Sequence, residues 1–325
     1  MGVGSVQIFR PLPLLGNPHV QTVLGSLLTG RGRTLRAHKH AVPLADGDRV
    51  ALHETAPRMD HPHRPIAVLI HGLGGSHRSA YLPRMARRLN DAGWRVFRMD
   101  LRGAGAGVRL ARRFYNAGCS DDIRAVVEYL SARWPGQPIV VAGFSLGGNI
   151  ALKLAGESAE QPLPGLHAVV AVAPPVDLVR CSTRLARHRF YDAFFVRLLV
   201  EQVSKHQHHF ADLPRIAFPR RLKLQGFDDI YTAPRWGYAD ALDYYQRASA
   251  LPHLGAIRVP TYILTARDDP FIAVEPFEEL TMPPSVEVQI TPHGGHLGFL
   301  GADGAGGIRW AETQIVRWME RSLQR

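Results

Sequence analysis

A serine between two glycines is the residue of this sequence best placed for covalent chemistry. Gly143-x-Ser145-x-Gly147 follows the apolar run 139–142 and precedes a segment with a helical pattern of apolar residues. A tight turn from strand to helix strains the backbone of such a serine, and side chains at the flanking glycines would collide. Ser145 would then lie at a helix N-terminus, where the dipole and free N–H groups favour developing negative charge. We expect Ser145 to be a nucleophile rather than a chance serine in a glycine-rich turn.

A serine nucleophile needs a base, and the base needs an orienting carboxylate. Behind a turn of this kind the chain order is serine, acid, histidine. Asp269 comes just after the predicted strand 261–266 and is our candidate acid, with the adjacent Asp268 as the alternative. His296 follows the last predicted strand, behind two glycines, and is our candidate base, with His293 as the second choice.

The developing oxyanion needs two backbone N–H donors. The loop 71–75, His-Gly-Leu-Gly-Gly, follows the first buried strand, and we expect its Leu73 amide to pair with the amide of Leu146. His71 is expected to organise this loop rather than to act as a base. A phosphate-binding turn is the alternative interpretation of the loop. However, it lacks the third spaced glycine of a dinucleotide fingerprint and the Gly-Lys-Ser/Thr of a P-loop.

The elements that must position these residues alternate between strand and helix. After a predicted β-hairpin over 36–55 with its turn at 45–48, strands are expected at 66–70, 95–100, 138–142, 167–173, 261–266 and 286–290. Helices are expected at 79–92, 121–133, 146–157 and 308–323. This alternation predicts an α/β fold with a mostly parallel central sheet and helices on both faces.

The interval 177–250 breaks the alternation. It carries helical apolar patterning, for example at Phe194, Phe195, Leu198 and Leu199, but no strong strand. We therefore expect one domain over 1–325, with 177–250 inserted as a helical lid over the site.

Composition excludes several classes of protein. The chain has 325 residues, of which 46% are hydrophobic and 21% charged, so it is not disordered. Its two cysteines, Cys119 and Cys181, exclude a disulfide framework and a four-cysteine zinc site; we expect unpaired thiols, with a single bridge between them as the alternative. It has no apolar run of about 18 residues, which excludes a spanning helix. Residues 1–28 lack the features of a signal peptide, so a cytoplasmic location is expected.

The formal net charge of +11 is concentrated in two segments. Residues 84–113 hold nine arginines against two aspartates, and residues 180–223 hold ten basic against three acidic residues. No recognition motif for nucleic acid accompanies them. The hypotheses are contact with an anionic membrane surface or an acidic substrate, or simply a solvated basic face.

A histidine cluster in the second basic segment raises the question of a metal. His206, His208 and His209 have no acidic or histidine partner at metal-ligand spacing, so we expect a solvated basic surface rather than a metal site. We expect no cofactor.

The motifs jointly resemble the α/β-hydrolases and, more narrowly, the YheT-like (AB hydrolase 4) family. The resemblance covers nearly the whole chain and rests on residues 17–22, 71–75, 100–105, 143–149, 227–229, 232–234, 237, 244–245, 248–249, 266–271 and 293–299. One departure is Ala106, where a serine often follows the second glycine of the 102–105 loop.

The resemblance implies a serine carboxylic ester hydrolase with Ser145, Asp269 and His296 as its charge-relay triad. It would act through an acyl-enzyme on small-molecule esters with short- to medium-chain acyl groups, or on lipid-like esters. One alternative is an acyltransferase that passes the acyl group to an alcohol or lipid. Another is a non-catalytic binding protein built on the same scaffold, although all three triad members are present.

Overall fold

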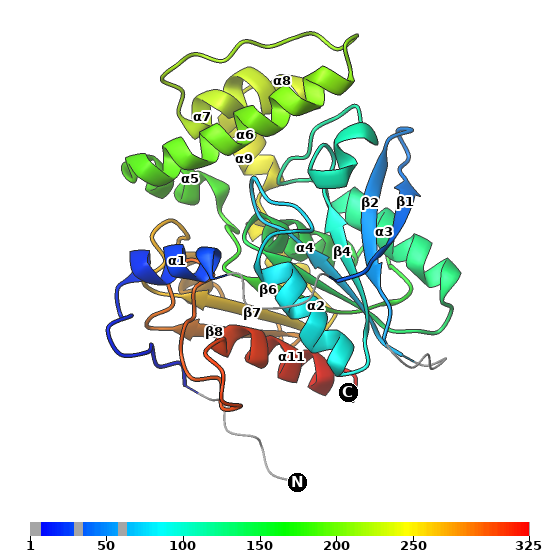
Figure 1. The fold of residues 1–325 in the computed structure, drawn as a ribbon, viewed down its shortest axis with the longest axis vertical. Helices are drawn as coiled ribbons and strands as arrows, with labels where there is room; N and C mark the ends of the chain where they lie inside the picture. Colours follow the sequence, from blue (N-terminus) through cyan, green and yellow to red (C-terminus); the bar gives the residue numbers. More distant parts are fainter. Residues whose placement is uncertain (1–7, 29–34, 58–63, 325) are drawn as a thin grey trace.

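The computed structural model describes residues 8–28, 35–57 and 64–324, so the first seven residues of the segment considered for a signal peptide lie outside it. Its centre is an eight-stranded sheet in the order β1-β2-β4-β3-β5-β6-β7-β8 (Figure 1). The strands are β1 His38–Pro43, β2 Arg49–Thr55, β3 Ile66–Ile70, β4 Arg95–Asp100, β5 Ile139–Phe144, β6 Leu166–Val172, β7 Thr261–Ala266 and β8 Val286–Thr291. The hairpin β1–β2 and the pair β2–β4 are antiparallel, and the other neighbours are parallel. The predicted fold class is therefore confirmed.

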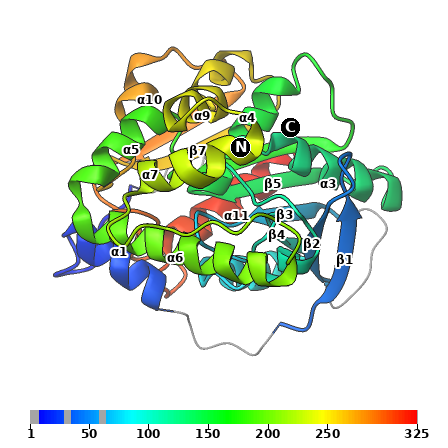
Figure 2. The ribbon, with the colours of Figure 1, turned by 90° about the horizontal axis from the view of Figure 1, so that it is seen from above.

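Each central strand is apolar along its whole length because both of its faces are covered. In β5, Ile139 and Val141 join one core cluster, while Val140 and Ala142 join the cluster on the opposite face. The helices α3 (Ser120–Arg133) and α4 (Leu146–Glu157) contribute to the first cluster. The helices α2 (Tyr81–Asp91) and α11 (Trp310–Ser322) contribute to the second, and Figure 2 shows the sheet between these layers. Two buried faces explain the continuous apolar runs of the sequence.

The predicted ranges of these elements differ from the observed ones by at most two residues. Helix 146–157 begins and ends as expected, whereas the helix expected at 79–92 spans Tyr81–Asp91.

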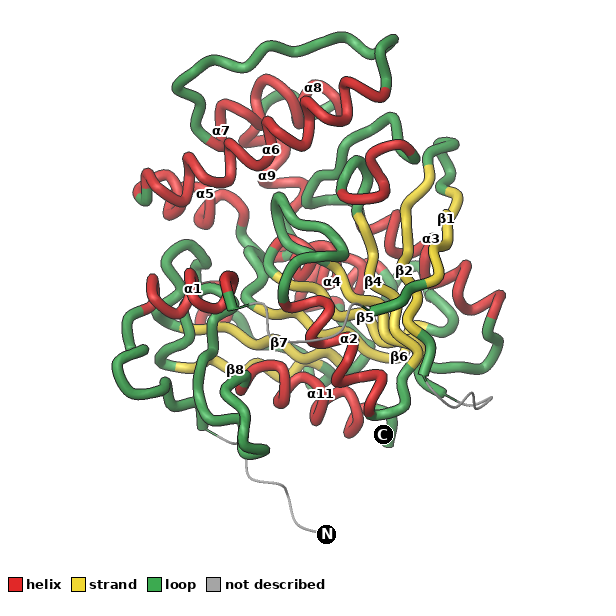
Figure 3. Tube along the Cα trace, viewed as in Figure 1, coloured by secondary structure: helices red, strands yellow, loops and turns green. Residues whose placement is uncertain are grey.

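Residues 177–250 fold into helices, joined by loops, that form a group above the sheet in the view of Figure 3. These are α5 Leu178–Arg187, α6 Arg189–His209, α7 Leu224–Phe227, α8 Ala233–Trp236 and α9 Ala241–Ala248, with a π-helical turn at Asp228–Thr232. The long helix α6 contacts the loop after β3, because Gln202 Nε2 donates to the carbonyl oxygens of Gly74 and Gly75.

Shorter elements complete the chain. They are α1 Pro18–Leu27, α10 Glu275–Glu279 and the 3₁₀ turns Gly105–Arg109 and Leu251–Ala256. Cys119 and Cys181 are buried and unpaired, as expected. Among the described residues, no helix combines the length and the apolar character that crossing a bilayer would require.

Candidate active site

The turn between β5 and α4 holds Ser145 in a strained conformation. Its φ of 52° and ψ of −122° are unusual for a residue with a side chain. A Cβ at Gly143 would lie 2.0 Å from the carbonyl oxygen of Gly147, and one at Gly147 would lie 2.7 Å from the carbonyl oxygens of Ile70 and His71. Only glycine fits at these two positions, which is the reason for the spacing seen in the sequence.

Ser145, His296 and Asp269 form one hydrogen-bonded line. His296 Nε2 lies 2.9 Å from Ser145 Oγ, and His296 Nδ1 lies 2.8 Å from Asp269 Oδ2. The other carboxylate oxygen, Oδ1, accepts from the amides of Phe271 and Ile272, each at 3.0 Å. The buried carboxylate is therefore held by the backbone on one side and faces the imidazole on the other.

The two alternative residues lie beside this line. Asp268 accepts from the Gly295 amide at 2.9 Å and contacts the ring of His293 at 3.3 Å. His293 is exposed and faces Asp268 rather than Ser145. This pair shapes the loop that carries His296, and the carboxylate next to His296 is that of Asp269.

The N-terminal helix α1 positions the histidine loop, a role that the sequence analysis did not assign. The amide of His296 donates to Thr22 Oγ1 at 2.9 Å. Gln21 bonds both backbone groups of Leu300, accepting from its N–H at 2.7 Å and donating to its carbonyl at 3.2 Å. At Gly295 (φ 53°), a Cβ would lie 2.3 Å from the carbonyl of Pro18. The sequence did contain a signal for this role. The motif 17–22 is one of the segments that carry the family resemblance, but no function was assigned to it.

The loop after β3 passes directly beside the nucleophile. A Cβ at Gly72 would lie 3.0 Å from the Cβ of Ser145. The amides on either side of Leu73 are occupied, since Gly72 donates to Tyr81 Oη at 2.9 Å and Gly74 donates to Tyr115 Oη at 2.8 Å. Within the described part of the chain, the amides of Leu73 and Leu146 donate to no protein acceptor. Both remain available to an oxygen atom of a ligand.

His71 is a buried member of the same loop. Its Nδ1 lies 2.8 Å from the Gly72 carbonyl, and its Nε2 accepts from the Leu101 amide at 3.2 Å. Burial lowers the pKa of His71, which keeps the ring neutral. These contacts match the organising role expected from the sequence.

Beneath this loop, Asp100 binds two further histidines. Its carboxylate lies 2.9 Å from His53 Nε2 and 2.8 Å from His77 Nδ1, and it accepts from the amides of His77 and Ala106 at 2.7 and 2.9 Å. Burial alone would raise the pKa of Asp100, but the hydrogen bonds from the histidines hold it well below its usual value. At Ala106, the departure noted in the sequence, the contact is made by the backbone.

Ser145 borders two cavities of different size. The larger, of about 550 Å³, is also lined by His296, by α1 and by the apolar face of α6. The smaller, of about 90 Å³, is also lined by Leu146 and by residues of α5 and α9. Asp228 lies at the smaller cavity, where it accepts from Thr232 Oγ1 and Tyr245 Oη; burial raises its pKa to about 7.

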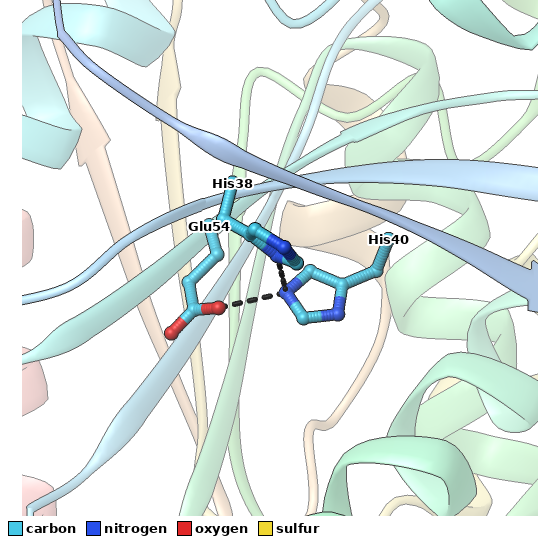
Figure 4. A group of neighbouring side chains, drawn as sticks. All are labelled: His38, His40 and Glu54. Carbon is cyan, nitrogen blue, oxygen red and sulfur yellow. Dashed lines mark hydrogen bonds and ion pairs between the residues drawn. The ribbon is translucent and has the colours of Figure 1, made fainter.

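Two groups of side chains among the described residues could offer three metal ligands, the first being His53, His77 and Asp100. The second, at the β1–β2 edge, is His38, His40 and Glu54 (Figure 4). His40 Nε2 lies 2.7 Å from Glu54 and 3.1 Å from His38 Nδ1, but Glu54 also pairs with the Arg95 guanidinium. A cation there would have to compete with Arg95, and neither group lines the cavities at Ser145.

The histidines of α6 are not gathered into such a group. His206 is buried and its Nε2 contacts the Ala111 carbonyl at 2.8 Å, so a solvated surface is wrong for this residue; His208 and His209 are exposed.

The two basic segments differ once the chain is folded. In 84–113, several arginines turn inward; Arg102 pairs with Asp122 at 2.7 Å and Arg84 with Glu312 at 2.6 Å. In 180–223, the pair Arg180–Glu279, at 3.1 Å, joins two exposed side chains. Several arginines of the first segment are therefore held in ion pairs rather than presented on a solvated basic face.

Comparison with known proteins agrees with this architecture. A family model described as "alpha/beta hydrolase fold" matches residues 65–303. YheT of Escherichia coli (strain K12), named as a candidate esterase, is 33% identical over 97% of this chain and 94% of its own. The phospholipase ABHD3 of Mus musculus is 28% identical over 86% of this chain and 70% of its own length.

Solved structures show the same fold at low identity. The esterase Pf2001 of Pyrococcus furiosus superposes with a TM-score of 0.59 at 17% identity, covering 97% of this chain and 98% of its own. Est1E of Butyrivibrio proteoclasticus, solved with ferulic acid, gives a TM-score of 0.58 at 15% identity, covering 88% and 100% of the two chains. The chain thus belongs to the α/β-hydrolase fold family and, within it, to the YheT-like branch of esterase- and lipase-type hydrolases.

Proposed function

We propose that this protein is a serine carboxylic ester hydrolase that works through an acyl-enzyme on Ser145. The observation that carries the proposal is the line Asp269–His296–Ser145, with contacts of 2.8 and 2.9 Å, ending at a strained serine that borders two cavities. A nucleophile, a base and an orienting carboxylate in this order are the requirements of acyl transfer to a hydroxyl.

In the first half of the reaction, His296 Nε2 takes the proton of Ser145 as Oγ attacks the ester carbonyl carbon. The amides of Leu73 and Leu146 donate to the oxyanion. The bond from carbon to the alcohol oxygen then breaks, and the alcohol leaves with the proton from His296. Asp269 holds the ring and stabilises its charged form.

In the second half, His296 takes a proton from water as the water attacks the acyl carbon. The bond between the acyl carbon and Ser145 Oγ then breaks, the acid leaves, and His296 returns the proton to Ser145 Oγ. These residues supply both the proton transfers and the charge stabilisation.

We also propose that residues 177–250 act as a lid over this site within the single domain. Two features support this role. Helix α6 lines the larger cavity through Phe194 and Leu198, and it is tied to the loop of Leu73 through Gln202.

Peripheral contact with an anionic membrane surface is a further part of the proposal. Phe190 and Leu27 line the larger cavity yet are 93% and 65% exposed, and Arg187 and Arg189 flank this end of α6. An apolar rim with basic neighbours suits an anionic interface. We expect co-sedimentation with phosphatidylserine vesicles that weakens with salt and is lost in Phe190→Ser; equal binding to phosphatidylcholine would contradict it.

The primary test is Ser145→Ala assayed with p-nitrophenyl butyrate. We expect kcat to fall on the order of 10⁶-fold, because the triad acts as a unit. Ser158→Ala at the far end of α4, whose hydroxyl bonds the Ala155 carbonyl, is the matched control and should retain activity. Unchanged turnover in Ser145→Ala, or failure of a fluorophosphonate to label the wild type, would reject the proposal.

Acyl transfer is the second candidate function, favoured by one relative. A protein of Saccharomyces cerevisiae that is 24% identical over 79% of this chain is named as a medium-chain fatty acid ethyl ester synthase/esterase. Adding ethanol to the assay separates the two outcomes, because only transfer yields a new ethyl ester.

A further inference from the structure

Each of the two cavities at Ser145 is lined by one catalytic group that the other cavity lacks. Ser145 and Leu73 line both. His296 lines the larger cavity, whereas Leu146, whose amide is the second expected oxyanion donor, lines the smaller one. This division assigns a direction to each bond of the reacting carbon.

The tetrahedral intermediate has four substituents. One is Ser145 Oγ, and a second is the oxyanion, which points to the amides of Leu73 and Leu146. The third is the alcohol oxygen, which must lie next to His296 Nε2 because that nitrogen supplies its proton. The alcohol therefore extends into the cavity that His296 lines, of about 550 Å³. The remaining direction, that of the acyl chain, leads into the cavity of about 90 Å³.

The smaller cavity has walls that are fixed by packing. Cys181 and Leu185 of α5 are buried in a cluster with Phe271, Ile272 and Ala273. Elsewhere in the lining, Tyr245 Oη donates to Asp228 at 2.7 Å, and Tyr244 Oη accepts from the Ala117 amide at 2.9 Å. Moving side chains that are held in this way, to admit a longer acyl chain, would cost free energy.

Size sets the limit on the acyl group. A cavity of about 150 Å³ holds a benzene molecule, which has six carbons. The cavity of about 90 Å³ is thus large enough for an acyl group of roughly two to four carbons.

The larger cavity has the opposite character. Its apolar lining includes Val23 and Leu27 of α1 and Phe190, Phe194 and Leu198 of α6. Phe194 is 54% exposed, so this cavity reaches the surface. It suits a long apolar alcohol.

We propose, resting on the esterase function above, that the preferred substrates are short-chain acyl esters of large apolar alcohols. The small cavity takes the acyl group and the large one the alcohol. This is the reverse of a medium-chain acyl group esterified to a small alcohol.

Octyl acetate and ethyl octanoate test the proposal because they are isomers that differ only in the position of the ester bond. We expect kcat/KM for octyl acetate to exceed that for ethyl octanoate by at least about tenfold, since each methylene that a site rejects costs about that factor. Equal or higher kcat/KM for ethyl octanoate would overturn the assignment while leaving the esterase function intact. Hydrolysis of p-nitrophenyl acetate but of neither isomer would also overturn it.

Failure of the underlying function has a different signature. Absence of hydrolysis of any ester, together with no fluorophosphonate label on Ser145, would remove the esterase proposal itself.

Truncating one wall of each cavity gives matched variants. Leu185→Ala, in the small cavity, should raise kcat/KM for hexyl octanoate relative to hexyl acetate by about tenfold. Phe194→Ala, in the large cavity, should change the ratio of kcat/KM between octyl acetate and ethyl acetate. It should leave the ratio between hexyl octanoate and hexyl acetate unchanged. If thermal unfolding shows that Leu185→Ala does not fold, Leu185→Val serves as the milder truncation, with a smaller shift in the same direction. An acyl ratio that responds to Phe194→Ala and not to the Leu185 variants would contradict the assignment.

Discussion

Two buried aspartates contact histidines at the same edge of the sheet, and the two sites differ in what the histidines contact next. Asp100 ends β4 and contacts His53 and His77, whose rings stack with centroids 3.5 Å apart. Asp269 follows β7 and contacts His296, whose other nitrogen lies 2.9 Å from Ser145 Oγ. Burial and a histidine partner are common to both aspartates, so neither feature by itself marks a catalytic acid.

The difference lies on the far side of each histidine. His296 connects Asp269 to a hydroxyl that borders two cavities. His53 and His77 converge on one carboxylate, which also accepts from the amides of His77 and Ala106. Asp100 therefore holds two loops together, whereas Asp269 contacts the histidine that we propose as the base. Substitutions should separate these roles into stability and catalysis.

The largest expected effect is on catalysis at Asp269. Asp269→Asn should lower kcat for p-nitrophenyl butyrate by about 10⁴-fold, because the amide no longer stabilises the charged imidazole or its productive tautomer. The adjacent Asp268→Asn, which affects a loop contact with Gly295, is the control and should cost far less. A larger loss in Asp268→Asn than in Asp269→Asn would reverse the assignment of the acid.

The next effect is on stability at Asp100. Asp100→Asn should lower the free energy of unfolding by about 3–5 kcal/mol, since it removes a buried carboxylate that contacts two histidines and accepts from two backbone amides. Urea denaturation measures this quantity, with the exposed Asp91→Asn as the matched control. If Asp100→Asn proved as stable as the control and only slowed turnover, the contrast with Asp269 would fail.

Another buried aspartate, Asp228, accepts from the hydroxyls of Thr232 and Tyr245, and we expect it to make stability depend on pH. Its pKa of about 7 in the folded state lies above its ordinary value because of burial. At a pH between these two values, the folded protein keeps this proton while the unfolded chain has lost it. Stability should fall by about 2–3 kcal/mol as pH rises from 5 to 8, and the decrease should level off above pH 7. Asp228→Asn should remove this component in urea titrations across that range; an unchanged pH profile would contradict it.

The smallest effect concerns the loop of His296. Thr22→Val removes the hydroxyl that accepts from the His296 amide and should lower kcat about threefold to tenfold, as expected for a single hydrogen bond. Thr22→Ser should restore turnover, which a purely steric role for the threonine methyl group would not allow. Equal kcat in Thr22→Val and wild type would show that α1 does not position the base.

Much of the fold could be predicted from local patterns in the sequence. The apolar runs of β3 and β5 predicted strands buried on both faces, and the glycines around Ser145 predicted a turn whose backbone φ is indeed positive. These patterns are local because strand burial and turn geometry constrain residues that are adjacent in the chain.

Other features of the site depend on contacts between distant residues. Asp268 and Asp269 are adjacent, and only the path of the backbone after β7 places the second against His296. Thr22 and His296 are 274 positions apart, so their contact leaves no mark in local spacing. From the sequence alone, the arginines of 84–113 suggest a basic surface. In the folded chain, Asp122 and Glu312 form ion pairs with two of them.

The residue types along the chain were therefore sufficient for the strands, the strained serine and the order of the candidate acid and base. Tertiary packing alone decided which carboxylate meets the histidine, which helix supports its loop and how large each cavity at Ser145 is. The physical reason is that turn strain and apolar periodicity are properties of neighbouring residues. Cavity volume and ion pairing, by contrast, depend on side chains that meet only after the sheet and its helices have packed.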